Sequence, residues 1–438
     1  MYGLASDGGP CNVLPDSNST ESNPWSWNQY VNMLYIDQPN TVGFSYSTLV
    51  NSTLSLLDLG SEITDTGITA CEAYNGSVPA ANTTFLYGTL PGQDFDHTPN
   101  STSLAGRTLW YFSQAWFSAF PEWKTCNKNI SVWGNSYAGS WVPATAAYMQ
   151  KQNVRIRAAG VEGLVGLTPQ MAYNNTYGLE VINKTIYETA VHDWDKAGGC
   201  SDQMEQCSTE LGARYDPEQF AVNTAVNDVC VAALLYCGTD VIGPFDIYGD
   251  RNDFDIRQTK PAPFPFNWVV GFFNQHWVQE ALGTPVNFTA DSTAVNNHLF
   301  DIGGDPISYA GLIDLEYLLE SGVKVALAYR DANYRFSAFQ PETSFRIFNR
   351  AISDKDVATG ELPTNGPGNY STEGPQSSFH IKNELPEPPP ISCYLWYVEQ
   401  SCSVDQSLAL ANGTAEIVDF TVVEPAGGGG PLDFATGF

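Results

Sequence analysis

Short apolar runs and longer segments of helical periodicity alternate along the chain. Runs rich in β-branched and aromatic residues predict buried strands at 32–36, 130–133 and 323–328. Between the first two runs lies a polar, Pro-bearing excursion over about 48–103. The chain therefore divides into strand-forming blocks that are separated by long connections.

Helices are predicted where apolar residues recur every three or four positions. The segment 104–120 has such a stripe and is stopped by Pro121. The stripe, which we expect to face the core, consists of Leu109, Phe112, Trp116 and Phe120. A second helix is predicted over 312–321, ended by Gly322, and a third over 342–352. The inward residues of the third are Phe345, Phe348 and Ile352. The polar, Cys-bearing segment 169–245 is also largely helical in pattern and is interpreted as a cap.

Ser136 follows the predicted strand 130–133 in the run Gly134-Asn135-Ser136-Tyr137-Ala138-Gly139. Small residues two before and two after a serine allow the sharp strand-to-helix turn that exposes a nucleophile. We expect a helix over 140–149, with Ser140 as its cap. The pattern predicts a nucleophile elbow, in which the backbone N–H of Tyr137 serves an oxyanion.

These residues resemble the active-site signature of the serine carboxypeptidases, especially the fungal branch. Other segments are similar to the same family, over most of residues 1–355. They are Asn32-Met33-Leu34-Tyr35-Ile36-Asp37-Gln38-Pro39 with Gly43-Phe44-Ser45-Tyr46, Tyr248 to Arg257, Phe273-Asn274, and Val278 to Gly283. The resemblance implies an α/β-hydrolase fold with a central mixed, mostly parallel sheet, a helical cap insertion and an irregular C-terminal tail. It also implies that the family's Asn-Gly-Gly-Pro-Gly-Ser-Ser segment and early strands would precede Tyr2, so the chain looks N-terminally truncated.

The expected organisation has four parts. They are a first part of the hydrolase core with the elbow at 1–168, a cap at 169–245, a second part of the core at 246–354, and a Pro- and Gly-rich extension at 355–438.

A serine hydroxyl needs a base to take its proton and a carboxylate to orient that base. The resemblance places the catalytic carboxylate at Asn333, which is an amide here, and Asp331 could substitute only through a shift of the turn. The family's histidine run, expected before Gln340, is absent, so the chain looks internally deleted. His380 alone follows the acid position, and we interpret it as a solvated tail residue rather than the base. Loss of the base lowers turnover by about a million-fold.

Specificity for a chain end requires donors to the terminal carboxylate. In the family a carboxylic acid stands just before the serine, and here Asn135 replaces it; its amide can still donate to a carboxylate. No phosphate loop or zinc spacing is present in the sequence, and we expect neither a metal nor a cofactor. The expected partners are peptide or protein C-termini.

The composition favours a secreted or vacuolar protein. The net charge of −29 disfavours nucleic acid and anionic membranes, and no run of about 18 apolar residues predicts a membrane span. Nine cysteines indicate an oxidising compartment, with clusters at 200–237 and 393–402 whose pairing the spacing leaves open. N-glycans are expected at eleven sequons, which begin at Asn18, Asn51, Asn75, Asn82, Asn100, Asn129, Asn174, Asn183, Asn287, Asn369 and Asn412.

Three hypotheses for the function remain at this point. The first is a serine carboxypeptidase-like hydrolase, in which Ser136 forms an acyl-enzyme and releases C-terminal residues, impaired in this chain by the losses above. The second is a catalytically inactive secreted glycoprotein that binds peptide ends or persists as a folded remnant. The third is an esterase or acyltransferase of the same fold. For the chain as written, the missing histidine favours inactivity.

Overall fold

A computed structural model describes residues 1–438 with the exception of 58–67, 71–81, 124–128, 165–168, 174, 253, 261–267, 310, 330–339, 366–369, 373–381, 389 and 427–438. The positions Asp331, Asn333 and His380 fall in these exceptions and lie outside the described residues.

A three-stranded parallel sheet is the centre of the α/β core. Its strands are β6 (Ile130–Asn135), β7 (Ile156–Leu164) and β8 (Lys324–Tyr329), in the order β6-β7-β8. The sequence predicted β6 and β8 correctly. β7 was not predicted, since its small residues, such as Ala158, Ala159 and Gly160, weaken the apolar signal. Crossover helices join strands of the same direction, as parallel pairing requires.

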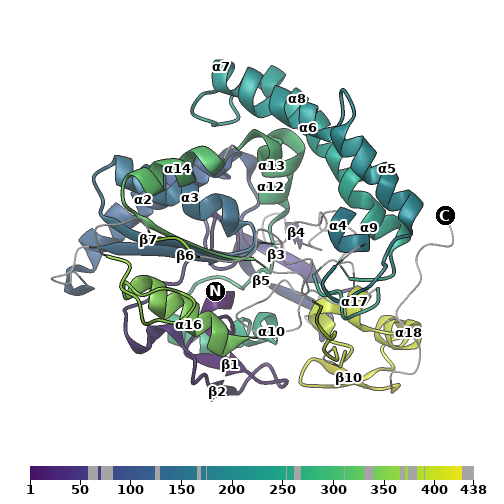
Figure 1. The fold of residues 1–438 in the computed structure, drawn as a ribbon. Coiled ribbons are helices and arrows are strands. Elements are labelled where there is room, and N and C mark those ends of the chain that lie inside the picture. The colour runs from purple at the N-terminus through teal and green to yellow at the C-terminus, as the bar shows by residue number, and fades with distance from the viewer. Residues whose placement is uncertain are drawn as a thin grey trace.

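Helices cover both faces of this sheet (Figure 1). On one side lie α2 (Thr102–Ala119), α3 (Ala138–Lys151) and α14 (Gly311–Glu320), and on the other lies α16 (Pro341–Ile352). The apolar cluster beneath α3 joins the helix to β7 and α14. Its buried members are Val142, Ala146, Ala147, Met149, Ile156, Ala159, Leu318 and Val323. Helices on both faces of a parallel sheet bury its strands from both sides.

The prediction for α16 is confirmed. The predicted core stripe of α2 is correct for Leu109, which packs on the cluster beneath α3, but wrong for Phe112 and Phe120. Phe345, Phe348 and Ile352 are buried against Trp27, whose ring stacks on Phe348 at 4.5 Å. In α2, by contrast, Phe112 and Phe120 are exposed at 42% and 45%. The buried positions of α2 are Thr102, Ala105 and Gly106.

The misplaced stripe has a packing cause. A Cβ on Gly106 would lie 3.1 Å from the backbone nitrogen of Thr145, so α2 approaches α3 through its small residues. Large residues cannot occupy so close a helix crossing. Phe112 and Phe120 therefore lie outside this contact, which periodicity alone did not show.

The N-terminal part of the chain packs beside the sheet without joining it. Its elements are α1 (Tyr2–Ala5), β1 (Cys11–Val13), β2 (Thr20–Ser22) and η1 (Trp27–Gln29). The predicted strand 32–36 is wrong: these residues form no strand in the structure. No backbone hydrogen bond joins them to a described strand. Among the described residues no strand lies beside them to pair with, and none of the five is fully buried.

The excursion 48–103 contains a second, antiparallel sheet in the order β4-β3-β5. Its strands are β3 (Leu49–Ser55), β4 (Ile68–Ala70) and β5 (Phe85–Pro91), and η2 (Phe95–His97) follows them. After α2 comes the short η3 (Pro121–Trp123). This sheet packs through Leu54 and Leu56 on the largest apolar cluster of the described chain, which also contains Phe273 and Phe288.

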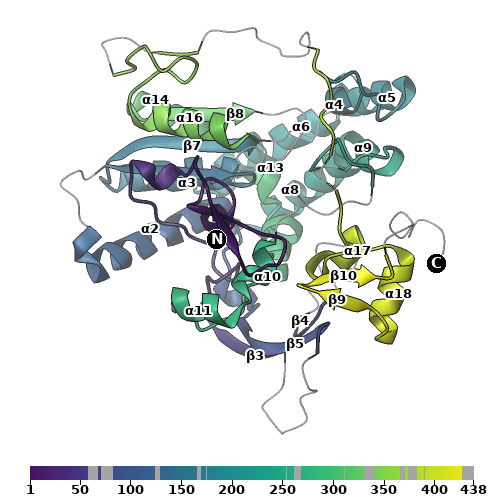
Figure 2. The same cartoon turned by 90° about the horizontal axis from the view of Figure 1, so that it is seen from below.

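All the regular elements in the described part of the predicted cap are helices. Its elements are α4 (Pro169–Tyr173), α5 (Lys184–Asp195), α6 (Cys200–Glu205), η4 (Gln206–Gly212), α7 (Ala213–Tyr215), α8 (Thr224–Tyr236), η5 (Cys237–Ile242) and α9 (Gly243–Tyr248). Two disulfides, Cys200–Cys237 and Cys207–Cys230, close it. Figures 1 and 2 show the cap helices beside the sheet, on one flank of the molecule.

One helical run in the cap differs from the sequence expectation on membrane spans. Thr224–Tyr248 is long and apolar enough to cross a membrane by length and composition, and 33% of its most apolar stretch is buried. Both disulfides of the cap attach to this run, at Cys230 and Cys237. The run is therefore tied to neighbouring helices as part of a packed layer.

The connection from the cap to β8 consists of short helices, α10 (Val269–Phe273), α11 (His276–Leu282), α12 (Thr293–Asn296), η6 (Asn297–Ile302) and α13 (Asp305–Ser308). The described end of the chain is more regular than the irregular tail that we expected. It forms η7 (Leu395–Tyr397), α17 (Val398–Ser401), α18 (Val404–Asn412), β9 (Glu416–Val418) and β10 (Thr421–Glu424), closed by the disulfide Cys393–Cys402. Tyr394 is fully buried there, and its hydroxyl lies 2.8 Å from Ser17 Oγ. The apolar run 393–398, which contains Tyr394, follows a Pro-rich stretch at 386–390, and this is why we expected the whole region to be irregular.

Candidate active site

Ser136 lies between the end of β6 and the start of α3, where the sequence predicted the elbow. Its φ is +65°, in the left-handed region that L-residues seldom adopt. The Gly139 N–H donates to the Ser136 carbonyl at 2.7 Å, and the Ser140 N–H donates to the Tyr137 carbonyl at 2.9 Å. These bonds close the turn directly into the helix. We refer to residues 134–139 as the elbow.

Helix α3 begins earlier than the sequence predicted. It starts at Ala138, and its N-cap position is Tyr137, which makes no side-chain capping bond. Ser140 is therefore inside the helix, and its predicted role as the cap is wrong. Because the turn and the helix overlap, the first helical N–H groups lie next to the serine, where anionic charge is favoured.

The Tyr137 backbone N–H has no acceptor among the described residues. It remains available to an external oxygen beside Ser136. An unpaired N–H at this place is what an oxyanion donor requires before a substrate arrives.

Asn135 ends β6 and pairs with Glu162 of β7 in the ladder. Its Oδ1 is buried and has no hydrogen-bond partner among the described residues. A buried amide oxygen without a partner is costly unless a ligand donates a hydrogen bond to it. The chemistry of Asn135 therefore fits contact with a polar group near the serine.

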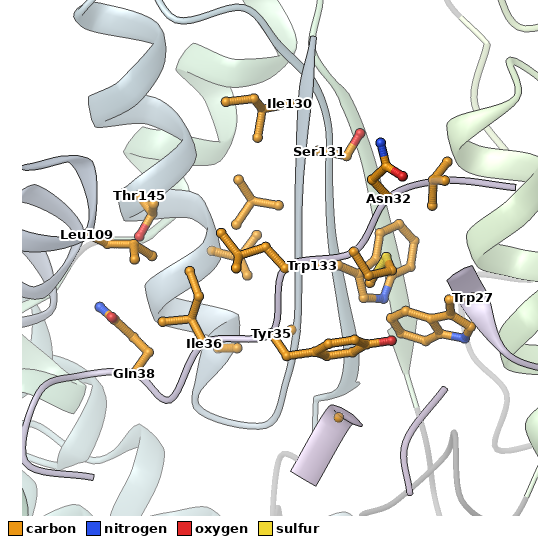
Figure 3. A pocket seen from close by; sticks show the side chains of 18 of the residues that line it. Trp27, Asn32, Tyr35, Ile36, Gln38, Leu109, Ile130, Ser131, Trp133 and Thr145 are labelled. Carbon is orange, nitrogen blue, oxygen red and sulfur yellow. The ribbon is translucent and has the colours of Figure 1, made fainter. Parts of the chain in front are cut away.

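A large cavity lies along the free edge of β6, and we refer to it as the β6 cavity. It has a volume of about 1500 Å³, and Gly134, Asn135 and Ala138 are the elbow residues that line it. Figure 3 shows its walls: β6 with Ile130 and Trp133 faces the extended segment that carries Tyr35 and Ile36. The cavity separates the segment 32–36 from β6, which explains why these residues join no sheet.

The β6 cavity is largely apolar but contains unsatisfied polar atoms. Among the described residues, the lining atoms without a partner are Trp27 Nε1, Tyr35 Oη, Trp133 Nε1, Asn135 Oδ1, Trp141 Nε1 and Thr145 Oγ1. Burial, with a smaller contribution from Cys11, raises the pKa of Tyr35 to about 12, so its hydroxyl stays neutral. The cavity thus combines apolar walls with neutral hydrogen-bonding groups.

None of the described histidines is hydrogen-bonded to the serine. The Nδ1 of His97 lies 2.7 Å from Asp94 Oδ2, and the Nδ1 of His298 lies 3.2 Å from the Thr98 carbonyl oxygen. His192 and His276 belong to α5 and α11. Over the described part of the chain, no side chain makes a hydrogen bond with Ser136 Oγ. The structure thus brings together Ser136, Asn135 and the Tyr137 N–H, but no described base.

A buried carboxylate beside the elbow was missed in the sequence. Asp305, 1% exposed, accepts hydrogen bonds from the Tyr137 hydroxyl at 2.6 Å and from the Thr102 backbone N–H at 2.7 Å. It also accepts from Thr102 Oγ1 at 2.5 Å. Burial raises the pKa of Asp305 above its usual range, although the bonds from Thr102 and Tyr137 oppose that shift. The sequence Asp305-Pro306 indicates a helix start, but nothing in it indicates the partner 168 residues away.

Comparison with known proteins now identifies the class. The family model described as serine carboxypeptidase matches residues 1–355. The chain belongs to the serine carboxypeptidase family, whose fold is the α/β hydrolase, and it is by family a serine-type peptidase that acts on peptides.

Individual relatives agree with this assignment. The chain is 35% identical to carboxypeptidase S1 homolog A of Arthroderma otae, over 98% of this chain and 76% of that protein. It is 33% identical to the carboxypeptidase Y homolog of Arthroderma benhamiae, over 97% of this chain and 79% of that protein. Among solved structures, a prohormone-processing carboxypeptidase from Saccharomyces cerevisiae matches with a TM-score of 0.44 and 17% identity, over 83% of this chain and 67% of that one.

Proposed function

We propose that Ser136 is the nucleophile of a serine carboxypeptidase reaction on peptide C-termini. The observation that carries this proposal is the left-handed φ of +65° at Ser136, at the junction of β6 and α3. Such backbone strain persists where the surrounding structure enforces it, and it concentrates at functional sites. The serine is thereby presented at the carboxyl end of a parallel strand, where α/β proteins bind their ligands.

In the proposed reaction, the Ser136 oxygen attacks the last peptide carbonyl and its proton passes to a base. The carbonyl oxygen becomes an oxyanion that the Tyr137 N–H stabilises, which is worth roughly 3–4 kcal/mol per donor in such sites. The C–N bond then breaks, the terminal residue leaves as an amine that takes up the proton, and water hydrolyses the acyl-enzyme. Asn135 is proposed to donate to the terminal carboxylate of the substrate.

Turnover is expected to be strongly impaired. Asn333 stands at the family's acid position, Asp331 is the alternative acid, and both lie outside the described residues. An amide in place of the orienting carboxylate lowers turnover by about 10⁴-fold, and loss of the base by about 10⁶-fold. A second candidate function is therefore an inactive peptide-binding glycoprotein. The observation that favours it is that no described histidine is hydrogen-bonded to Ser136.

The proposed location is the secretory pathway or the vacuole, with N-glycans on exposed sequons. Three disulfides formed in the structure support passage through an oxidising compartment. Asn18 and Asn183 begin sequons at helix or turn surfaces that are exposed. A mobility shift after endoglycosidase treatment of the protein from its natural source tests this part.

The function is tested by labelling the purified chain with a fluorophosphonate, with Ser136→Ala as the control. Labelling that is lost in the variant, together with release of the last residue from a blocked dipeptide, supports the carboxypeptidase. Labelling with hydrolysis of esters only would indicate the esterase instead. A chain that is folded by its circular dichroism but never labelled would be the inactive glycoprotein.

A further inference from the structure

The hydroxyl of Tyr137 is held from several directions, although the proposed catalytic atom of this residue is its backbone N–H. The hydroxyl donates to Asp305 at 2.6 Å. The ring packs against Trp141 of α3 at 5.1 Å and Phe300 of η6 at 5.5 Å, between ring centroids. Because the ring packs against two aromatic side chains and the hydroxyl is hydrogen-bonded, the backbone of Tyr137 has little freedom to move.

The partner of this hydroxyl is itself immobile. Asp305 is the first residue of α13, and its two oxygens also accept two bonds from Thr102, the first residue of α2. Carboxylates that accept three short bonds in a buried site are held more firmly than those with one neutral partner. Asp305 therefore joins the elbow to the beginnings of two separate helices.

Helix α13 is in turn fixed by the cap. Ile307 packs in the cluster around the disulfide Cys207–Cys230, with Val226 and Ala233 of α8. Gly304, just before α13, has a φ of +56° and lies so close to α8 that an added Cβ would be 2.7 Å from the Cys230 carbonyl carbon. The cap helix, α13, Asp305 and Tyr137 thus form one continuous packed path.

We propose that Asp305 is a positioning residue for the elbow: by holding the Tyr137 side chain, it fixes the Tyr137 backbone N–H in its place beside Ser136. This role rests on the proposed function for its catalytic meaning, since the N–H matters only if an oxyanion forms there. The proposed restraint on the position of Tyr137 does not depend on whether the protein is active. The bond to Asp305 restrains Tyr137 whether or not the serine reacts.

The structural part is tested by hydrogen exchange of the Gly139, Ser140 and Trp141 amides, which donate to carbonyls of Ser136 and Tyr137. In Tyr137→Phe, we expect these amides to exchange about tenfold faster, because loss of a bond to a charged group loosens the turn. In Asp305→Asn, the exchange of these amides should be faster still, because the new NH₂ group would face the hydrogen-bond donors of Thr102 or Tyr137. The matched control is Tyr309→Phe, which removes a buried tyrosine hydroxyl that donates to Asp314 at 3.0 Å instead. Equal acceleration in Tyr137→Phe and Tyr309→Phe, or none in either, would overturn the proposal.

The catalytic part is tested by the second-order rate of fluorophosphonate labelling and by dipeptide hydrolysis. Tyr137→Phe should lower the labelling rate and kcat about tenfold and leave KM unchanged, because the oxyanion donor acts on the transition state. If the unsubstituted chain is never labelled, the proposed function fails, while the exchange result still decides the role of Asp305. If the chain is labelled but the exchange and labelling rates of Tyr137→Phe match those of the unsubstituted chain, Asp305 is not a positioning residue and the proposed function stands.

Discussion

Gly134 touches Ala138: a Cβ added to Gly134 would lie 2.4 Å from the Ala138 Cβ. This contact joins the strand before the serine to the helix after it. In the sequence, small residues on both sides of the serine are only a pattern. In the structure, the short distance between positions 134 and 138 shows the steric reason for it. Every side chain larger than hydrogen at position 134 must push α3 away from β6.

The first prediction concerns this contact. Gly134→Ala should lower stability by about 1–3 kcal/mol through overpacking, and it should reduce fluorophosphonate labelling of Ser136 because the elbow is displaced. Thermal unfolding and labelling rates measure the two effects. Gly238→Ala is the control, because its Cβ would meet nothing within 4 Å and it lies in a helix. An unchanged melting temperature in Gly134→Ala would contradict the steric argument.

Ser136 should itself be a source of strain. A left-handed conformation costs a non-glycine residue roughly 1–2 kcal/mol, so Ser136→Gly is expected to raise the stability of the chain by about 1 kcal/mol while abolishing labelling. Ser136→Ala keeps a Cβ and should abolish labelling with no such gain. Urea unfolding compares the two variants. Identical midpoints for both would show that the φ of +65° is not strained.

The junction between the cap and α13 gives a third prediction. Gly304 and Gly178 both have positive φ, +56° and +71°, but only Gly304 has neighbours where a Cβ would be placed. Alanine at either site should cost about 1 kcal/mol for the backbone conformation. Gly304→Ala should cost at least 1 kcal/mol more, since the Cβ meets the Cys230 backbone. Equal melting temperatures for the two variants would mean that α13 separates from α8 freely.

The fourth prediction concerns the acidity of Asp305. Its pKa is raised chiefly by burial, so the folded state binds a proton at a pH where the unfolded chain, with an ordinary pKa of 3.8, does not. This group therefore adds stability as the pH falls from above the raised pKa toward 3.8, by at most about 1.4 kcal/mol per pH unit. Asp305→Asn lacks that contribution.

The measurement is the melting temperature of both proteins between pH 7 and pH 4. The difference between the original chain and Asp305→Asn should grow in favour of the original chain as the solution is acidified. A difference that stays constant, or shrinks, would indicate that Asp305 has an ordinary or lowered pKa.

The sequence correctly predicted those elements whose structure is determined by residues close together in the chain. The elbow around Ser136 follows from the small residues at 134 and 138, and α16 follows from the apolar face of Phe345 and Phe348. In both cases the residues that make the pattern are also the residues that pack. The same local pattern led to Ser136 and the Tyr137 N–H as site residues, while Asn135 came from the family resemblance; their roles stay predictions.

Features that depend on distant partners were not predictable. The apolar run 32–36 predicted a strand, but a strand needs a neighbour to pair with. The sequence did not show that the β6 cavity would separate this run from β6. The stripe of α2 correctly predicted a helix and the inward position of Leu109 but not the exposure of Phe112 and Phe120, because the contact with α3 is set by Gly106 and Thr145. Asp305 lies 168 residues from Tyr137 in the chain, and nothing short of the fold brings them together.

The edge of β6 that faces the β6 cavity is unpaired among the described strands, and this has a consequence for how copies of this protein behave together. The strand Ile130–Asn135 carries neither a charge nor a proline, the usual devices that keep strand edges of separate molecules apart. Instead, the net charge of −29 makes copies of the protein repel one another before their strand edges can meet. Colloidal stability then depends on ionised carboxylates across the whole surface, and it declines wherever acid or concentrated salt removes their mutual repulsion.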